Sequence, residues 1–175
     1  MRQLRGTDLK RFHRAYRRAH PLQHDLVLLL QNVEYATNVG SVFRIAEGCR
    51  AAELILSGIT PSPPHPRISK VARGKVRRVS WQHVERPDQA VDALKGDGYR
   101  ICAVELTENA VPYYEYDYPE KICLIAGHED HGIPNHTLRL CDDAVFVPMY
   151  GKGLSLNVHV ALAIVCYHIR YTEVV

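Results

Sequence analysis

Three polar clusters hold most of the side chains that could do chemistry, and each cluster follows an apolar run. Their candidate members are two amides, a guanidinium, a carboxylate and a hydroxyl: Asn38, Arg44, Glu129, Ser155 and Asn157. Neutral amides and hydroxyls can orient a polar substrate, and an arginine can hold an anion or stabilise a developing negative charge. Because ligands of open α/β sheets bind beyond the carboxyl ends of the strands, these clusters predict one shared site.

Each cluster taken alone also has a plainer interpretation. Arg44 lies opposite an apolar stripe on a helical wheel, which is typical of a solvated arginine, and Glu129 could be an ordinary surface carboxylate. His128, Glu129 and His131 do not have the spacing of a known zinc signature, so we expect no metal. The surrounding GHEDHG stretch also lacks the GxGxxG pattern of a dinucleotide-binding loop.

The third cluster lies in a predicted strand–loop–helix segment. The strand should end at Pro148, which cannot donate a hydrogen bond to a sheet. Gly151 and Gly153 would let the loop turn sharply and approach a ligand closely. Ser155 and Asn157 fall where a long apolar helix should begin, and both residue types are good N-caps. The local pattern alone therefore fits a strand, a turn and a capped helix.

The elements that must position these clusters alternate along the chain. Strands are predicted at 26–30, 53–56, 79–84, 100–104, 122–126 and 144–147, and helices at 42–49, at 87–95, after Pro134 and after Asn157. Residues 31–40 are predicted to form a polar turn. The continuous apolar run at 26–30 is typical of a strand buried on both faces. Strands that alternate with helices predict an α/β fold with a mostly parallel sheet flanked by helices.

Length and composition limit the remaining possibilities. A chain of 175 residues suits one core, so residues 1–175 are predicted to form a single domain. No apolar run approaches the roughly 20 residues of a membrane span, and the basic N-terminus lacks the apolar stretch of a secretory signal. The five cysteines have no CxxC spacing, which favours reduced thiols and a cytoplasmic protein.

The positive charge is concentrated in two segments, although the net charge is only +3. Residues 1–20 should form a basic helix or arm with one apolar stripe, and a second basic segment spans 67–78. The residues singled out as candidate contacts are Arg11, Arg14, Arg18, Lys70, Arg73, Lys75, Arg77 and Arg78. Two basic patches on a nearly neutral chain suggest a polyanionic partner, although a solvated basic face remains an alternative.

The motifs together resemble those of the SpoU (TrmH) family of RNA ribose methyltransferases. The resemblance rests on N-x-G-x-x-x-R from Asn38 to Arg44, on IAGHEDHGIP and on VPMYGKGLSLNV, and it covers roughly residues 25–170. It implies transfer of a methyl group from S-adenosylmethionine to a ribose 2′-hydroxyl of tRNA or rRNA. It also implies a homodimer and a SPOUT-like fold with a deep C-terminal trefoil knot, which periodicity alone would not suggest.

The resemblance also assigns roles to residues. Arg44 would be catalytic, with Asn38, Glu129, Ser155 and Asn157 supporting it. The cofactor would lie near Leu106, Gly127, Val147, Met149 and Leu156, and the basic residues named above would contact RNA. Whether Arg44 is a general base or an electrostatic stabiliser stays open, because a guanidinium holds its proton strongly. His159 stands where a small serine is common, and packing at an interface or contact with the cofactor are both open to it.

Two other functions compete with methyl transfer. A non-catalytic RNA-binding relative could keep the fold and lose the reaction, although the intact set of polar residues argues against it. A nucleotide-binding α/β protein with another cofactor is the third possibility. Within the methyltransferase interpretation, the small size slightly favours tRNA over rRNA.

Overall fold

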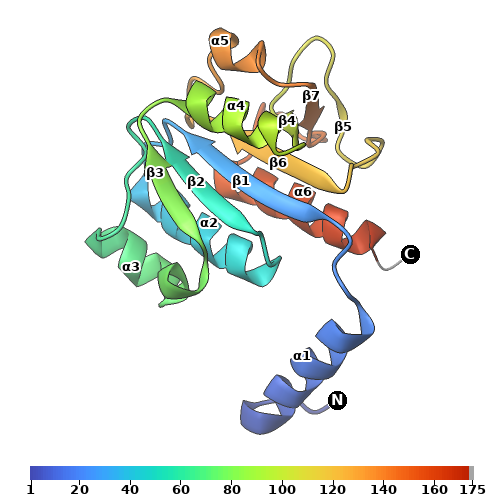
Figure 1. Ribbon diagram of the computed structural model, residues 1–175. Coiled ribbons are helices and arrows are strands. Elements are labelled where there is room, and N and C mark those ends of the chain that lie inside the picture. Colours follow the sequence, from blue (N-terminus) through green and yellow to red (C-terminus); the bar gives the residue numbers. More distant parts are fainter. Residues whose placement is uncertain (174–175) are drawn as a thin grey trace.

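A central parallel sheet organises the chain, of which the computed structural model describes residues 1–173 (Figure 1). The strands are β1 (Asp25–Gln31), β2 (Glu53–Ser57), β3 (Trp81–Val84), β4 (Arg100–Val104), β5 (Val111–Pro112), β6 (Lys121–Ala126) and β7 (Asp143–Phe146). The helices are α1 (Gly6–Ala19), α2 (Ala36–Gly48), α3 (Pro66–Ala72), α4 (Pro87–Gly96), α5 (Asn135–Leu138) and α6 (Val158–Thr172), with a 3-10 turn η1 (Lys75–Arg78). Within these residues the strand order is β3-β2-β1-β6-β4-β7-β5, and each pairing is parallel.

The sheet is buried on both faces, as the apolar run in β1 predicts. Leu28 pairs in register with Leu54 of β2 and Leu124 of β6, and all three side chains are fully buried. Alternate residues of β1 point to opposite faces. Leu28 packs in the core under α2 and α6, whereas Leu29 packs in the core under α4. The prediction of an α/β fold with a helix-flanked parallel sheet is confirmed.

Helix α2 begins earlier than the sequence suggests, and the predicted polar turn through residue 40 is wrong in its second half. The helix starts at Ala36, so Asn38 and Gly40 lie in its first turns. Gly40 lets α3 pack closely, because a Cβ atom at this position would lie 2.8 Å from the Cβ of Val71 and 3.0 Å from the carbonyl oxygen of Ile68. The glycine thus serves helix packing rather than a turn.

The segment before α6 also differs from the prediction. Strand β7 ends at Phe146, before Pro148, and its outer neighbour is the two-residue strand β5, which was too short to be recognised. Asn157 occupies the N-cap position of α6, but its side chain makes no capping hydrogen bond. The capping role that the sequence suggested for Ser155 and Asn157 is therefore wrong in this structure.

Helix α1 forms as predicted, but none of its residues is buried. Figure 1 shows it standing apart from the sheet, joined through the linker that leads into the amino end of β1. Its apolar stripe is open to solvent, since Leu9 is 40% exposed and Phe12 is 53% exposed. Along residues 1–173, no helix combines the length and apolar character that a membrane crossing requires.

A buried ion pair fixes the end of α6 to the start of β1. Arg170 contacts the Glu173 carboxylate at 2.5 Å and donates to the carbonyl oxygens of His24 and Cys49. Glu173 also accepts the backbone N–H of His24 at 2.9 Å. Burial works against the charge of Glu173, but the His24 N–H and the Arg170 guanidinium outweigh it and lower the pKa of this carboxyl. The pair ties the last helix to the central strand.

Candidate active site

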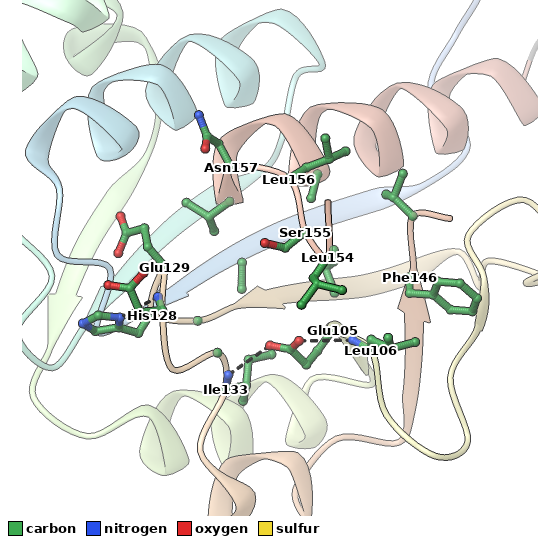
Figure 2. Close-up of a pocket in the computed structure, with 18 of the residues that line it drawn as sticks. Glu105, Leu106, His128, Glu129, Ile133, Phe146, Leu154, Ser155, Leu156 and Asn157 are labelled. Carbon is green, nitrogen blue, oxygen red and sulfur yellow. Dashed lines mark hydrogen bonds between the residues drawn. The ribbon is translucent and has the colours of Figure 1, made fainter. Parts of the chain in front are cut away.

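A cavity of about 1100 Å³ opens at the carboxyl ends of β4, β6 and β7, beside the start of α2 (Figure 2). It brings together residues from all three sequence clusters. The predicted residues that line it are Asn38, Leu106, Gly127, Glu129, Val147, Met149, Ser155, Leu156 and Asn157. This is the sheet edge at which open α/β folds bind ligands, so the shared location that the sequence suggested is observed.

Glu129 connects the loop after β6 to the start of α2. Its carboxylate accepts the backbone N–H groups of Glu34 at 2.9 Å and Tyr35 at 3.2 Å, and the side-chain Nδ2 of Asn38 at 2.6 Å. Tyr35, at the N-cap position, provides no side-chain cap, so an anion from a distant loop satisfies the open end of the helix. Partial burial opposes the charge, but the N–H groups of Glu34 and Asn38 outweigh it and lower the pKa of Glu129.

The other end of the Asn38 amide meets α6. His159 Nδ1 lies 3.0 Å from Asn38 Oδ1, across 121 positions of sequence. Burial lowers the pKa of the His159 imidazole, which favours its neutral form. Glu129, Asn38 and His159 therefore form a continuous hydrogen-bonded chain from the β6 loop through α2 to α6. Neither role that the sequence left open for His159 included this contact.

Arg44 stands apart from the cavity. It is exposed on α2, six positions after Asn38, which places it about 9 Å further along the helix axis and roughly 120° around it. Among residues 1–173, no side chain or carbonyl forms a hydrogen bond or ion pair with its guanidinium. The structure thus brings together every predicted catalytic residue except Arg44, whose role remains a prediction.

The wall formed by the segment after β7 is apolar and open to solvent. Figure 2 shows Leu154, Ser155 and Leu156 beside the cavity, with Asn157 at the start of α6. Leu154 is 94% exposed and Leu156 is 38% exposed, while Met149 is 36% exposed. These side chains offer apolar surface that a flat ligand could cover, because small-molecule pockets are lined mainly by apolar groups.

Glu105 is a cavity residue that the sequence interpretation missed. It follows β4 directly, and its carboxylate accepts the N–H of Leu106 at 3.1 Å and that of Ile133 at 3.2 Å (Figure 2). Gly132 has a φ of +62°, and a Cβ atom there would collide with this carboxylate. A carboxylate among the polar residues that follow an apolar strand is the signal that drew attention to Glu129, and the same signal could have identified Glu105.

The structure explains why position 127 holds a glycine. A Cβ atom at this position would overlap the backbone of Gly132 and Ile133, because the loop closes on itself through the bridge between His128 and Gly132.

Within the described residues, no group of three or more His, Cys, Asp and Glu side chains is arranged to hold a metal ion.

The two basic segments are differently placed. Residues Arg11, Arg14 and Arg18 are exposed on α1, which leads into the amino end of β1. Since the cavity lies at the carboxyl ends of the strands, the seven-residue strand β1 places α1 about 20 Å or more from it. The arm and the cavity of one chain therefore lie at opposite edges of the sheet.

The second basic segment, residues 67–78, lies beside α2. Its exposed cations are Arg67, Lys70, Arg73, Arg77 and Arg78. Two of the predicted RNA contacts form ion pairs with Glu47, since Lys75 lies 3.0 Å and Arg78 3.3 Å from its carboxylate. These pairs partly neutralise the segment, and the remaining cations provide its free positive surface.

The fold and cavity define a class of α/β proteins with a parallel sheet and a ligand site at its carboxyl edge. The sequence profile of the SpoU rRNA Methylase family matches residues 25–167, and the chain belongs to this family. It is 33% identical over 148 residues to a tRNA (guanosine(18)-2′-O)-methyltransferase of Escherichia coli K12, covering 83% of this chain and 62% of that protein. It is 32% identical over 144 residues to the 23S rRNA (guanosine(2553)-2′-O)-methyltransferase RlmP of Bacillus subtilis, covering 82% and 57%.

A solved structure supports the fold assignment. The SpoU methyltransferase AviRb from Streptomyces viridochromogenes, in complex with the cofactor AdoMet, superposes with a TM-score of 0.80. The match covers 98% of this chain and 64% of AviRb at 21% sequence identity. The chain thus spans less than two thirds of the length of all three proteins.

Proposed function

We propose that this protein transfers a methyl group from S-adenosylmethionine to a ribose 2′-hydroxyl of RNA. The observation that carries the proposal is the convergence of the three family motifs on one cavity at the carboxyl edge of the sheet. Family membership and the named activities of the tRNA and rRNA relatives support the reaction class. A non-catalytic RNA-binding relative would not need to preserve this arrangement.

The residues of the cavity fit S-adenosylmethionine. The apolar side chains of Leu106, Met149 and Leu156 can cover an adenine ring. The cofactor carries a cationic sulfonium, and the cavity lining contains the carboxylates of Glu105, Glu129 and Asp130 against the single ammonium group of Lys152. When bound, the cofactor supplies an electrophilic methyl group. Residues Leu106, Gly127, Val147, Met149 and Leu156 are proposed to hold it.

Glu129 is proposed to position the site rather than to remove a proton. Three N–H donors already occupy its carboxylate, and its lowered pKa makes it a weak base. Its contribution is to fix Asn38 and the start of α2. Ser155 and Asn157 can then orient the ribose with neutral hydrogen bonds, since an in-line approach of the hydroxyl to the methyl group is the main requirement.

Arg44 is proposed to act on the RNA. Its exposed position suits contact with a phosphate and stabilisation of the negative charge that develops on the attacking oxygen. The alternative role as general base remains open within the proposal. A second subunit is part of the proposal as well, because the arm α1 cannot reach the cavity of its own chain across the sheet, whereas it could serve the cavity of a partner.

The basic residues are proposed to bind phosphates, which gives affinity without base selection. They are Arg11, Arg14, Arg18, Lys70, Arg73 and Arg77, with weaker roles for Lys75 and Arg78. We favour tRNA over rRNA as the substrate. The remaining parts of the proposal are a homodimer, a cytoplasmic location, a single domain over 1–175, a C-terminal trefoil knot formed around β7 and α6, and a reaction without metal.

Calorimetric titration with S-adenosylmethionine and S-adenosylhomocysteine, followed by transfer of tritiated methyl groups to total tRNA and total rRNA, tests the function. We expect micromolar cofactor binding and alkali-resistant labelling of one RNA class, since a 2′-O-methyl group blocks cleavage at that ribose. A folded protein that binds cofactor but labels neither RNA would refute the proposed reaction. A protein that binds RNA but no cofactor would indicate the non-catalytic alternative.

A further inference from the structure

We propose that His159 is a positioning residue that holds the amide of Asn38 in one orientation for the RNA ribose or phosphate. The inference rests on the proposed methyl transfer for its functional meaning, but its structural part stands on hydrogen-bond geometry. It goes beyond the motif residues, because position 159 belongs to none of the roles assigned from the family resemblance.

The orientation of the Asn38 amide follows from Glu129. An ionised carboxylate only accepts hydrogen bonds, so the group 2.6 Å from Glu129 Oε1 must be the Asn38 NH2 group. The amide oxygen then faces His159. If the amide were reversed, its oxygen would meet the carboxylate without a proton between them, which is unfavourable for two half-buried acceptors.

The tautomer of His159 follows in turn. Because Asn38 Oδ1 is an acceptor, the ring nitrogen 3.0 Å from it must carry the proton. A neutral His159 is therefore the Nδ1–H tautomer, with Nε2 left as an acceptor. This tautomer differs from the Nε2–H form that a free histidine ring prefers, so the arrangement has a spectroscopic signature.

Two anchors hold the amide plane where one would leave it free to rotate. Nδ2 is attached to the β6 loop through Glu129, and Oδ1 is attached to α6 through His159. Asn38 lines the cavity, and the second hydrogen of its NH2 group is used by no hydrogen bond within residues 1–173. That N–H is the donor whose direction His159 fixes, and a ribose or phosphate oxygen is the acceptor that suits it.

Substitutions can separate this role from simple packing. The Nδ2 of an asparagine at position 159 lies three bonds from Cα, as Nδ1 of histidine does, whereas the glutamine amide reaches one bond further. His159→Asn should therefore keep kcat within threefold of wild type, and His159→Gln and His159→Ala should lose about tenfold, the effect of one hydrogen bond of about 1.4 kcal/mol. The dissociation constant for S-adenosylmethionine should stay unchanged.

His168→Asn is the matched control. His168 lies on the same helix, is half-buried, has a pKa lowered by burial, and packs edge-on against Tyr113 at a centroid distance of 5.1 Å rather than against Asn38. Its replacement should change stability but leave kcat within threefold. Equal kcat losses in His168→Asn and His159→Ala, or equal losses in the asparagine and glutamine variants at position 159, would overturn the positioning role.

Nitrogen-15 NMR of the imidazole rings tests the geometry without any transfer assay. We expect His159 to show the Nδ1–H tautomer, identified by the signal that His159→Asn removes, and to move toward Nε2–H in Asn38→Leu. An Nε2–H tautomer in the wild-type protein would overturn the inference even if the enzyme is active. If the Nδ1–H form is present but no RNA is methylated, the proposed reaction fails while the hydrogen-bonded chain stands.

Discussion

Replacing Glu129 with glutamine should weaken both the fold and the reaction. The glutamine amide keeps one carbonyl oxygen, so it can accept at most the two donors that now meet Oε1, from Tyr35 and Asn38. The Glu34 N–H would then face an NH2 group. Losing one charge-assisted hydrogen bond and weakening two others would cost about 3 kcal/mol if the group were buried. Solvent screening of this half-buried side chain reduces the expected cost to about 2 kcal/mol.

Urea unfolding and methyl-transfer kinetics measure the two effects. If the whole free-energy loss raises the activation free energy of methyl transfer, kcat should drop about thirtyfold, which is the equivalent of about 2 kcal/mol. Glu34→Gln is the matched control, because it keeps the backbone N–H that Glu129 accepts and changes only a side chain that is 54% exposed and lies 3.5 Å from His128 Nε2, outside the Glu129 network. Wild-type stability and activity in Glu129→Gln would refute the argument that this carboxylate organises the start of α2.

The pH dependence of the unfolding free energy provides a second test of the role of Glu129. The pKa of Glu129 is lower in the folded protein than the value of about 4.3 expected for an unfolded glutamate. Its stabilising contribution is therefore present above about pH 4.3 and is lost as the pH falls through the lower, folded pKa. The difference in unfolding free energy between wild type and Glu129→Gln should shrink in that acid range. A difference that grows there would contradict the assignment.

Three further changes probe the rest of the molecule. Arg44→Ala should abolish transfer and leave cofactor affinity within threefold in calorimetry, because Arg44 does not line the cavity; an active variant would remove its catalytic role. Glu173→Gln should lower the free energy of unfolding in urea by about 3 kcal/mol, because it leaves the guanidinium of Arg170, 10% exposed, without its counter-charge; a change under 1 kcal/mol would show that the pair is replaceable. Arg73→Ala combined with Arg77→Ala should weaken RNA binding and reduce the slope of log affinity against log salt by up to about 2, measured by filter binding; an unchanged slope would place the RNA elsewhere.

The sequence predicted the sheet well because its strands are encoded locally. The apolar run at 26–30 is buried on both sides by neighbouring strands and helices, and its composition alone indicates that environment. The helix boundary at Ala36 was not predictable in the same way. It depends on the Glu129 carboxylate, which comes from a loop more than 90 positions away, and on the close approach of α3 to Gly40.

The sequence predicted which residues share the site more completely than it predicted the hydrogen bonds that connect them. The motif residues Asn38, Glu129, Ser155 and Asn157 share the cavity, as expected from strand ends that meet at one sheet edge. The His159 contact was missed because it joins positions that are 121 residues apart and no local pattern encodes it. Glu105 was missed although its signal was local, since it directly follows β4.

The long sequence separation within the site has a consequence for synthesis of the protein. A nascent chain that has emerged only through β6 contains Asn38 and both strands that flank β1, but it lacks the apolar wall at Leu156 and both anchors of the Asn38 amide, Glu129 and His159. Because the two contacts of the Asn38 amide span 91 and 121 positions of sequence, they should form late and slowly. The cavity would thus be completed only when α6 docks, and if the protein has the proposed activity, the incomplete polypeptide would remain inert toward the abundant RNA that surrounds it during translation.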